Sequence, residues 1–414
     1  MKMNEKHTAH LKENYGKNIL PLSVLENERM IAGSPNEILY FYRKDIPIGK
    51  LKESIIKTIE HYNLFSSRLI AIGENKFALQ YCTDGAVLNE LPPLDAVSRD
   101  LSLEDIKKMM VHVKTLPGEP LFAITGIPVK DGILAGISCS HTVADGISML
   151  LFLYAWMCIT EGRPFLPPSP QRLFKGLPVD SDKIHRVFLP SLSELSREIQ
   201  DKAGHYEKDE KLYTRREFFS DEFLADMKRT AQQENETCSI SSNQIIISFL
   251  LKKYHDHILR DTDKVRLRNG INLRDLHPDI DPLHLGNATF TSMTEFTRKE
   301  IHAMSIAQIA NRLKETIAGY RNEKFAKALS YLTEYGIEYN AEVLRQHHKA
   351  YNSETDINST NLTHLSDLES LGLSSNIGTI LDVSSVVHAG FVILKEKNGQ
   401  IFADVTSRYP FVQE

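Results

Sequence analysis

One uninterrupted stretch of this sequence dictates a strand, a corner and a helix in that order. Residues 133–137 are apolar and strand-like, and residues 147–160 carry no charged side chain over the length of a helix. Nine residues, 138–146, with the sequence SCSHTVADG, stand between them. A strand that passes directly into a buried helix is typical of an α/β fold, and such corners often carry functional side chains.

Alternating strand and helix patterns extend along the rest of the chain without a Rossmann-like repeat. The dipeptide Asp131-Gly132 predicts a hairpin that leads into the corner, and Asn398-Gly399 predicts another. Ser102, Ser220 and either Ser241 or Ser242 are expected helix N-caps. We expect helices over residues 22–30, 51–62, 102–113, 220–233, 242–257, 301–320 and 325–335, and strands over 38–42, 68–72, 76–81, 121–129, 133–138, 265–273, 288–296, 386–394 and 400–406.

The length of 414 residues favours two domains over a single core. After residue 160 several prolines are followed by a highly charged stretch, 180–216. We therefore expect an N-terminal domain over residues 1–175, an inter-domain crossover over 176–214 and a C-terminal domain over 215–414.

Composition excludes several classes of protein. The net charge of −5 argues against a nucleic-acid partner, and the short basic clusters are flanked by acids. The four cysteines lack the spacing of a zinc site or a disulfide framework, which suits a reducing compartment. The first 17 residues lack the apolar core of a secretion signal, and the apolar run 149–159 is too short for a membrane span. We expect a soluble, cytoplasmic protein.

The corner contains a His-x-x-x-Asp spacing that is weak evidence by itself. The same spacing occurs four times, as His141/Asp145, His205/Asp209, His257/Asp261 and His277/Asp281. The first pair alone is followed by glycine and alone joins a strand to a helix. Context, more than spacing, therefore singles out His141.

Residues 140–148, SHTVADGIS, resemble the His-x-x-x-Asp-Gly signature of the BAHD acyltransferases, which are grouped with chloramphenicol acetyltransferase and the condensation domains of peptide synthetases. Further stretches agree in the family's order: residues 51–54 with 64–69, then Asn272-Leu273-Arg274, then Leu285-Gly286-Asn287. The similarity covers most of the chain.

The resemblance breaks near the C-terminus. Plant members carry an Asp-Phe-Gly-Trp-Gly motif there, but the single tryptophan of this chain is Trp156. Residues 374–378, SSNIG, are instead similar to the Ser-Asn-x-Gly of alcohol acetyltransferases. This departure leaves the substrate class open more than the fold.

The resemblance implies two similar-sized α/β domains, each a chloramphenicol-acetyltransferase-like mixed sheet flanked by helices. It also implies a channel between them, with His141 near its middle. Acyl-CoA or an acyl-phosphopantetheine on a carrier protein would enter from one mouth, and a hydroxyl or amine acceptor from the other.

His141 is the expected general base, because a neutral imidazole with a pKa of about 6.5 can remove the acceptor's proton as it attacks a thioester. The alternative is a histidine satisfied within the core or a turn. Gly146 would leave room for the helix behind the base or for a ligand, unless it is an ordinary turn glycine.

Asp145 could hold His141 as in a Ser-His-Asp triad, or could simply cap the helix. The resemblance implies a third role, in which the aspartate points away from the histidine and pairs with an arginine of the other domain. Arg274 matches that arginine. We therefore expect Asp145 to hold the corner through a buried ion pair.

Three more residues are candidates by family position. Ser374 and Asn376 are expected near the oxyanion or the acceptor, with a polar loop as the alternative. Asn287 is expected to support the architecture or the donor channel.

These expectations amount to a monomeric acyl-CoA-dependent O- or N-acyltransferase of secondary metabolism. It would use direct attack in a ternary complex, with no metal and no permanently bound cofactor. Two rivals are a condensation-type ester or amide synthase acting on carrier-bound substrates, and a binding relative without activity. The histidines at 255, 257, 347 and 348 lie on charged helical segments, and the sequence gives no reason to assign them a metal.

Overall fold

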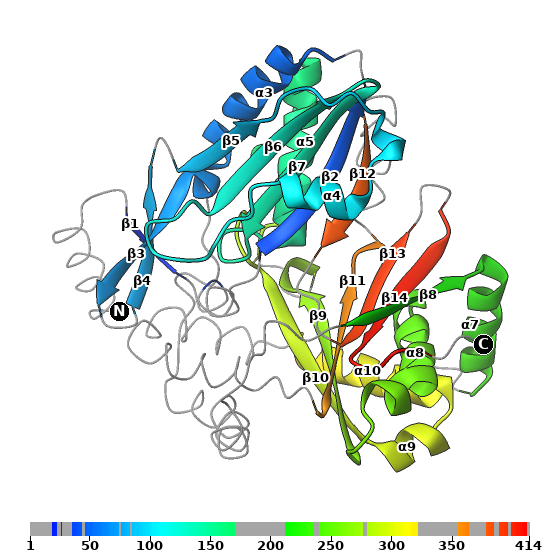
Figure 1. The fold of residues 1–414 in the computed structure, drawn as a ribbon. Coiled ribbons are helices and arrows are strands. Elements are labelled where there is room, and N and C mark those ends of the chain that lie inside the picture. The colour runs from blue at the N-terminus through cyan, green and yellow to red at the C-terminus, as the bar shows by residue number, and fades with distance from the viewer. Residues whose placement is uncertain are drawn as a thin grey trace.

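The computed structural model describes residues 19–22, 26, 35–43, 46–73, 76–82, 85–169, 212–234, 240–275, 280–321, 354–363, 378–384, 389–395 and 399–411. These residues form two mixed sheets with helices against them and one smaller sheet (Figure 1). The α/β class expected from the sequence, with a mixed sheet in each half, is confirmed.

The upper sheet in Figure 1 has five strands in the order β12–β2–β7–β6–β5. Their bounds are Gly378–Ser384, Pro35–Arg43, Gly132–Ser140, Phe122–Val129 and Ala86–Glu90. β5 and β6 run parallel, and the other neighbours run antiparallel. Because β7 is the central strand and all its residues are buried, its end is held from both sides.

Both faces of this sheet are covered. α3 (Ile48–His61) and α5 (Gly146–Glu161) pack on one face, and α4 (Leu103–Met109) packs on the other. The side chains of β2 alternate accordingly, with Tyr40 in the first core and Leu39 in the second.

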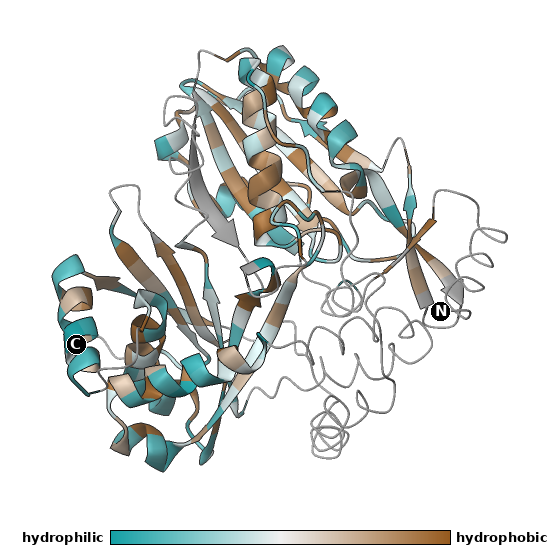
Figure 2. Cartoon of the chain, turned by 180° about the vertical axis from the view of Figure 1, so that it is seen from behind, coloured by the Kyte–Doolittle hydropathy of each residue, from teal (hydrophilic) through white to brown (hydrophobic). Residues whose placement is uncertain are grey.

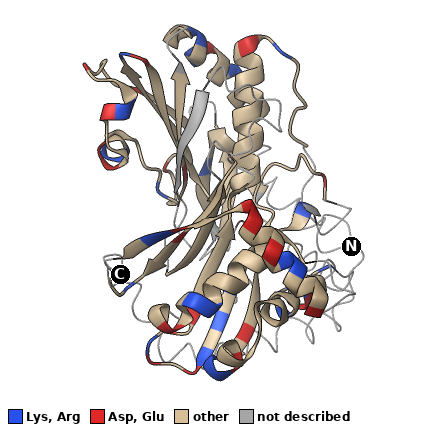
Figure 3. Ribbon diagram, turned by 90° about the vertical axis from the view of Figure 1, so that its right-hand side faces the viewer, with Lys and Arg blue, Asp and Glu red and all other residues tan. Residues whose placement is uncertain are grey.

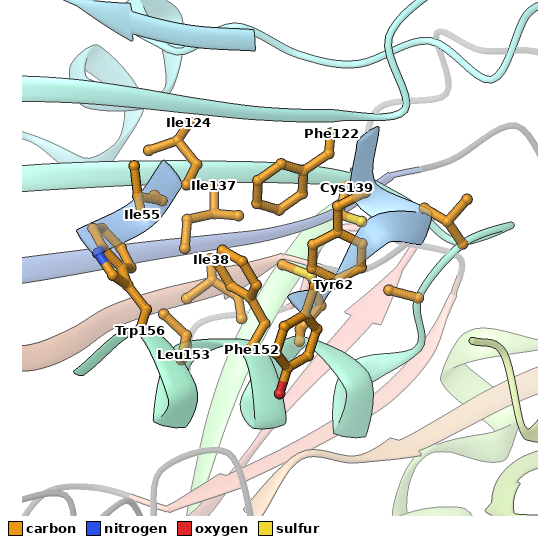
Figure 4. Packing of buried hydrophobic residues seen from close by; sticks show 14 of the residues in the cluster. Ile38, Ile55, Tyr62, Phe122, Ile124, Ile137, Cys139, Phe152, Leu153 and Trp156 are labelled. Carbon is orange, nitrogen blue, oxygen red and sulfur yellow. The ribbon is translucent and has the colours of Figure 1, made fainter. Parts of the chain in front are cut away.

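The α5 helix is apolar around most of its circumference, and Figure 2 shows it as a mainly brown column against the sheet. Phe152, Leu153 and Trp156 point from it toward Ile38 and Ile137 of the sheet (Figure 4). Burial of each such side chain stabilises the fold by roughly 1.5–3 kcal/mol. The long uncharged segment is therefore a core helix.

A smaller antiparallel sheet pairs β1 (Ile19–Pro21), β4 (Lys76–Tyr81) and β3 (Ser67–Gly73) in that order. The strands expected over residues 68–72 and 76–81 are confirmed as β3 and β4, and they pair antiparallel. The short 3-10 helices η1 (Asn63–Ser66) and η2 (Ser98–Asp100) lie in the connections of this half.

The lower sheet has six strands in the order β10–β9–β11–β13–β14–β8. Their bounds are Thr289–Thr297, Lys264–Asn272, Asp356–Asn361, Gly390–Lys395, Ile401–Ser407 and Tyr213–Phe219. One face packs against α7 (Asp221–Glu234), α8 (Ser242–Ile258), α9 (Arg298–Ala303) and α10 (Ile306–Gly319). Val392 and Leu394 of the opposite face pack against the core of the first half.

Charged residues lie on the outer helices and loops of both halves and on strands such as β8, whereas α5 carries one, Glu161 (Figure 3). None of the helices in the described ranges combines the length and the apolar character needed to cross a bilayer.

Several expected element bounds were wrong. α4 ends at Met109 and not at Val113, and the segment expected as one helix over 301–320 is two, α9 and α10. Ser305 separates the two by capping α10 through a capping box with Gln308. β8 begins at Tyr213, inside the stretch expected as the crossover. The helices expected over 22–30 and 325–335 lie largely or wholly outside the described residues.

The two halves of the chain share a sheet, which the sequence did not predict. β12 comes from the C-terminal part of the chain but pairs antiparallel with β2, at the edge of the first sheet. A division of the chain by residue number alone does not reproduce this arrangement, and the proposed domain limits of 1–175 and 215–414 remain a prediction.

Candidate active site

His141 is the first residue after the central strand β7, at the place where the chain turns toward α5. The Ser140 N–H donates to the Leu121 carbonyl at 2.7 Å, and Asn36 Nδ2 donates to the Ala144 carbonyl at 2.9 Å. The four residues that follow His141 are buried, whereas His141 itself is partly exposed. The corner is therefore held firmly in place, while His141 keeps partial exposure within it.

Asp145 and Arg274 form a buried ion pair that joins the two halves of the chain. Arg274 lies in the short 3-10 helix η3 (Leu273–Asp275), directly after β9. Its Nη1 donates to Asp145 Oδ2 at 2.7 Å and its Nη2 to Oδ1 at 3.2 Å. The Asp145 side chain is completely buried and that of Arg274 is 2% exposed. The structure thus brings together two residues 129 positions apart.

Two backbone N–H groups also donate hydrogen bonds to the Asp145 carboxylate. Oδ1 accepts from the Ser148 N–H at 2.9 Å, and Oδ2 accepts from the Ala288 N–H at 2.8 Å. Burial alone would raise the pKa of Asp145, but Arg274 and these hydrogen bonds outweigh it and hold the pKa well below its usual range. Asp145 is therefore ionised, and it caps α5 at the same time.

Ser148 and Gly286 add a second link between the halves. Ser148 Oγ donates to the Gly286 carbonyl at 2.8 Å, and it accepts from the Gly286 N–H at 3.2 Å and from Arg274 Nη2 at 3.1 Å. Gly286 has a φ of +134°, which L side chains rarely adopt. A β-carbon there would also stand 3.1 Å from the Glu26 carboxylate.

The remaining candidates lie in different places. Gly146 is the first residue of α5. Asn287 is buried, and its Oδ1 accepts from the Thr289 N–H at 3.1 Å, which holds the turn into β10. Ser374 and Asn376 lie outside the described residues. Around the corner, the part of the chain that the structure describes brings no three potential metal ligands together.

The sequence assigned no role to Ser148, Gly286 or Asn36, although the first two lie in stretches that resemble the family. Ser148 stands three residues after Asp145, the spacing of a capping contact, and could have been found by that signal. The role of the Gly286 carbonyl could not, because a backbone acceptor is the same in every residue.

Three comparisons place this geometry among known proteins. A model of the Transferase family matches residues 4–360. An uncharacterized acetyltransferase of Arabidopsis thaliana is 24% identical over 306 residues, which are 67% of this chain and 66% of that protein. The acetyltransferase adrJ of Penicillium rubens is 24% identical over 243 residues, 53% of this chain and 48% of that protein. The chain thus spans just under two thirds of the first relative and about half of the second.

Solved structures share the fold. TRI101 of F. sporotrichioides, complexed with coenzyme A and T-2, has a TM-score of 0.69 at 13% identity and covers 94% of this chain and 95% of its own. Vinorine synthase has a TM-score of 0.64 at 14% identity, over 94% and 90%. The condensation domain of the polyketide synthase MokA has a TM-score of 0.59 at 9% identity, over 94% and 92%.

Proposed function

Because this chain belongs to the Transferase family, we propose that it moves an acyl group from acyl-CoA to a hydroxyl or amine of a small-molecule acceptor. The likeness to BAHD acyltransferases expected from residues 140–148 is confirmed at the level of the family. The donor, the acceptor and the residue roles below are our proposal.

The observation that carries this proposal is the contrast between His141 and its surroundings. The corner is fixed by an ion pair, a helix cap and hydrogen bonds from both halves, yet His141 is partly exposed. A general base needs a fixed position together with access to substrate. This arrangement supports His141 in that role.

In the proposed reaction, His141 removes the proton of the acceptor as its oxygen or nitrogen attacks the thioester carbonyl. The tetrahedral intermediate then collapses, the carbon–sulfur bond breaks, and the proton passes to the departing thiolate. The products are the acylated acceptor and free CoA. No acyl-enzyme forms, because the acceptor attacks directly within a ternary complex.

Asp145 has a positioning role in this mechanism. Its oxygens accept from Arg274, Ser148, Ala288 and Thr289, so the carboxylate is already used in holding the corner. We therefore assign it no share in the proton transfer by His141, in contrast to the aspartate of a Ser-His-Asp triad.

The donors for the oxyanion remain candidates from the family resemblance. We propose Ser374 and Asn376 for this task, since one fixed donor contributes about 10²- to 10³-fold in rate. For Asn287 the hydrogen bond to the Thr289 N–H supports an architectural role.

The test is a transfer assay with a panel of acyl-CoA donors and alcohol or amine acceptors, in which free thiol is measured. Wild-type protein should release CoA thiol only when an acceptor is present. His141→Ala should lower the rate by about 10²- to 10⁴-fold while circular dichroism shows an unchanged fold. A purified His141→Ala variant with wild-type turnover would refute the proposed base.

The same assay separates the rival functions. Release of thiol only from an acyl-phosphopantetheine carrier protein would favour a condensation-type synthase. Condensation domains usually carry a second histidine directly before the catalytic one, and Ser140 stands at that position here, which weakens this alternative. Ser140 Oγ is hydrogen-bonded to Thr115 Oγ1 at 2.8 Å and holds the end of the strand. Absence of release from every donor, with retained CoA binding, would indicate a binding protein without activity.

A further inference from the structure

A second group of polar side chains lies where the end of α8 meets α9, in the C-terminal half. His255 and Asp256 come from the last turn of α8, and His302 comes from α9. His255 Nε2 is 3.3 Å from Asp256 Oδ1, and His302 Nε2 is 3.0 Å from Asp256 Oδ2. All three ligand atoms lie within 4.8 Å of one another.

The sequence did not predict this group, because His302 lies 47 residues beyond His255 along the chain. His257 is the nearest histidine to His255 along the sequence, but its side chain makes other contacts. Its Nε2 is 3.1 Å from the Tyr409 carbonyl, and its ring stacks on Phe411. In the folded chain His302, and not His257, therefore lies beside His255.

The protonation of His255 suits a ligand to a metal ion. Its Nδ1 lies 2.9 Å from the Leu251 carbonyl, which only accepts, so Nδ1 carries the proton of the neutral ring. Nε2 then presents a lone pair, and among the described residues it has no hydrogen-bond partner although it is buried.

The backbone of the second histidine is also held in place. Lys252 Nζ donates to the Ile301 and His302 carbonyls, both at 3.1 Å, and to the Met304 carbonyl at 2.5 Å. These bonds satisfy carbonyls at the end of α9. The His302 side chain is 57% exposed, which leaves a path for an ion from solvent.

We propose that His255, Asp256 and His302 bind a first-row transition-metal ion such as Zn²⁺ and thereby tie α8 to α9. Zinc lies about 2.0–2.2 Å from nitrogen and oxygen ligands, so two ligands of a tetrahedral site stand about 3.3–3.6 Å apart. The separations of 3.3 and 3.0 Å run from the two imidazole nitrogens to different oxygens of Asp256, and both are near that range. The hydrogen bond from His255 Nδ1 to a carbonyl is the outer contact that metal-binding histidines commonly make.

Arg298 determines which ions fit. It donates to Asp256 Oδ1 and is anchored by the carbonyls of Leu259, Arg260 and Thr262. Its charge offsets part of the charge of the carboxylate, so the imidazole nitrogens must provide most of the affinity. Imidazole suits zinc, copper and nickel, whereas calcium and magnesium require oxygen ligands.

The proposed metal site lies far from the proposed active site. The nine residues of β9 separate the Arg298 end of the sheet from the Arg274 end, a span of about 30 Å at 3.3 Å per residue. In Figure 1, α9 lies at the lower edge of the molecule, away from α5. The ion should therefore stabilise the C-terminal half without changing acyl transfer.

The experiment uses the full chain without a histidine tag, freed of metal by a chelator. Zn²⁺ is titrated in competition with a chromophoric chelator, and melting temperature is measured with Zn²⁺, Ca²⁺ or Mg²⁺. Wild-type protein should bind one more equivalent of Zn²⁺ than His302→Ala. Its melting temperature should rise with Zn²⁺ but not with Ca²⁺ or Mg²⁺. His302→Ala should bind at this site at least about 100-fold more weakly and lose the rise in melting temperature.

His257→Ala is the matched control, because it removes a histidine from the same end of α8 outside the group. It should keep the extra equivalent and the melting shift. Asp256→Asn should lose both while its circular dichroism stays native. Equal Zn²⁺ binding by His302→Ala and wild type, or an unchanged wild-type melting temperature with Zn²⁺, would overturn the proposal.

Discussion

Among the described residues, Arg274 and Arg216 each form paired hydrogen bonds to an aspartate, and their surroundings differ. Arg274 binds Asp145 inside the protein, and Arg216 binds Asp404 at 2.7 and 2.8 Å on the surface. The side chain of Arg216 is 48% exposed, whereas that of Arg274 is 2% exposed. The chemistry is the same, so the surroundings decide how much each pair contributes to stability.

Replacement of Arg274 by alanine should lower the free energy of unfolding by about 3–5 kcal/mol, because it leaves the buried Asp145 carboxylate without its counter-charge. The matched change Arg216→Ala should cost less than about 1 kcal/mol, since water screens the exposed pair. Urea unfolding of both variants measures the difference. Equal losses would show that the Asp145 pair has no special structural role.

At this scale the sequence indicated part of the site. Its resemblance to a family indicated that Asp145 and Arg274 would meet, and they do. It gave no sign of the Gly286 carbonyl, which accepts from Ser148 and Arg274. Contacts to backbone atoms depend on the path of the chain, which residue types alone do not reveal.

The ends of helices were also harder to predict from the sequence than their starts. Ser102 caps α4 as expected, but the helix stops at Met109 because tertiary bonds capture the next backbone groups. The Val111 N–H donates to Thr125 Oγ1 at 2.9 Å, and the Val113 N–H donates to Ser138 Oγ at 3.1 Å. Starts of helices carry local signals, whereas this end is set by a sheet distant in sequence.

His112, just beyond α4, connects that element to β2. Its Nδ1 is 2.6 Å from Glu37 Oε1, and its Nε2 is 2.8 Å from the Lys107 carbonyl. Both partners accept, so both ring nitrogens donate only when the imidazole is charged. Burial lowers the pKa of His112, but the Glu37 hydrogen bond and charge outweigh it, and the pKa is raised despite the nearby Lys107 ammonium.

The stabilisation from this contact should be complete below a pH of about 6.5, where the unfolded histidine is also charged, and should vanish as the pH rises through the raised folded value. NMR titration of the His112 ring should give a lower pKa in Glu37→Gln than in wild type. Histidines outside the contact serve as internal controls. An unchanged His112 midpoint in Glu37→Gln would contradict this assignment.

The whole molecule is joined across its two halves by several independent connections. β12 completes the first sheet, Arg274 neutralises Asp145, and Leu285 and Leu362 belong to the core of the first half. Neither half can unfold without exposing edges, charges or apolar surface of the other.

We therefore expect one cooperative thermal transition. In scanning calorimetry the calorimetric and van't Hoff enthalpies should agree, as they do for a single unit. Chains of this length with loosely coupled domains commonly give two transitions. Two separable peaks for the wild-type protein would show that these connections are too weak to couple the halves.

The position of β12 also affects how the protein is made. β2 leaves the ribosome early, but the strand that covers its free edge is synthesised only after most of the chain has emerged. Until then the edge of β2 exposes unpaired N–H and C=O groups, which can pair with an extended segment of another chain. Premature termination upstream of β12 should therefore yield an aggregation-prone product, and efficient production of this protein should depend on chaperones that shield nascent chains.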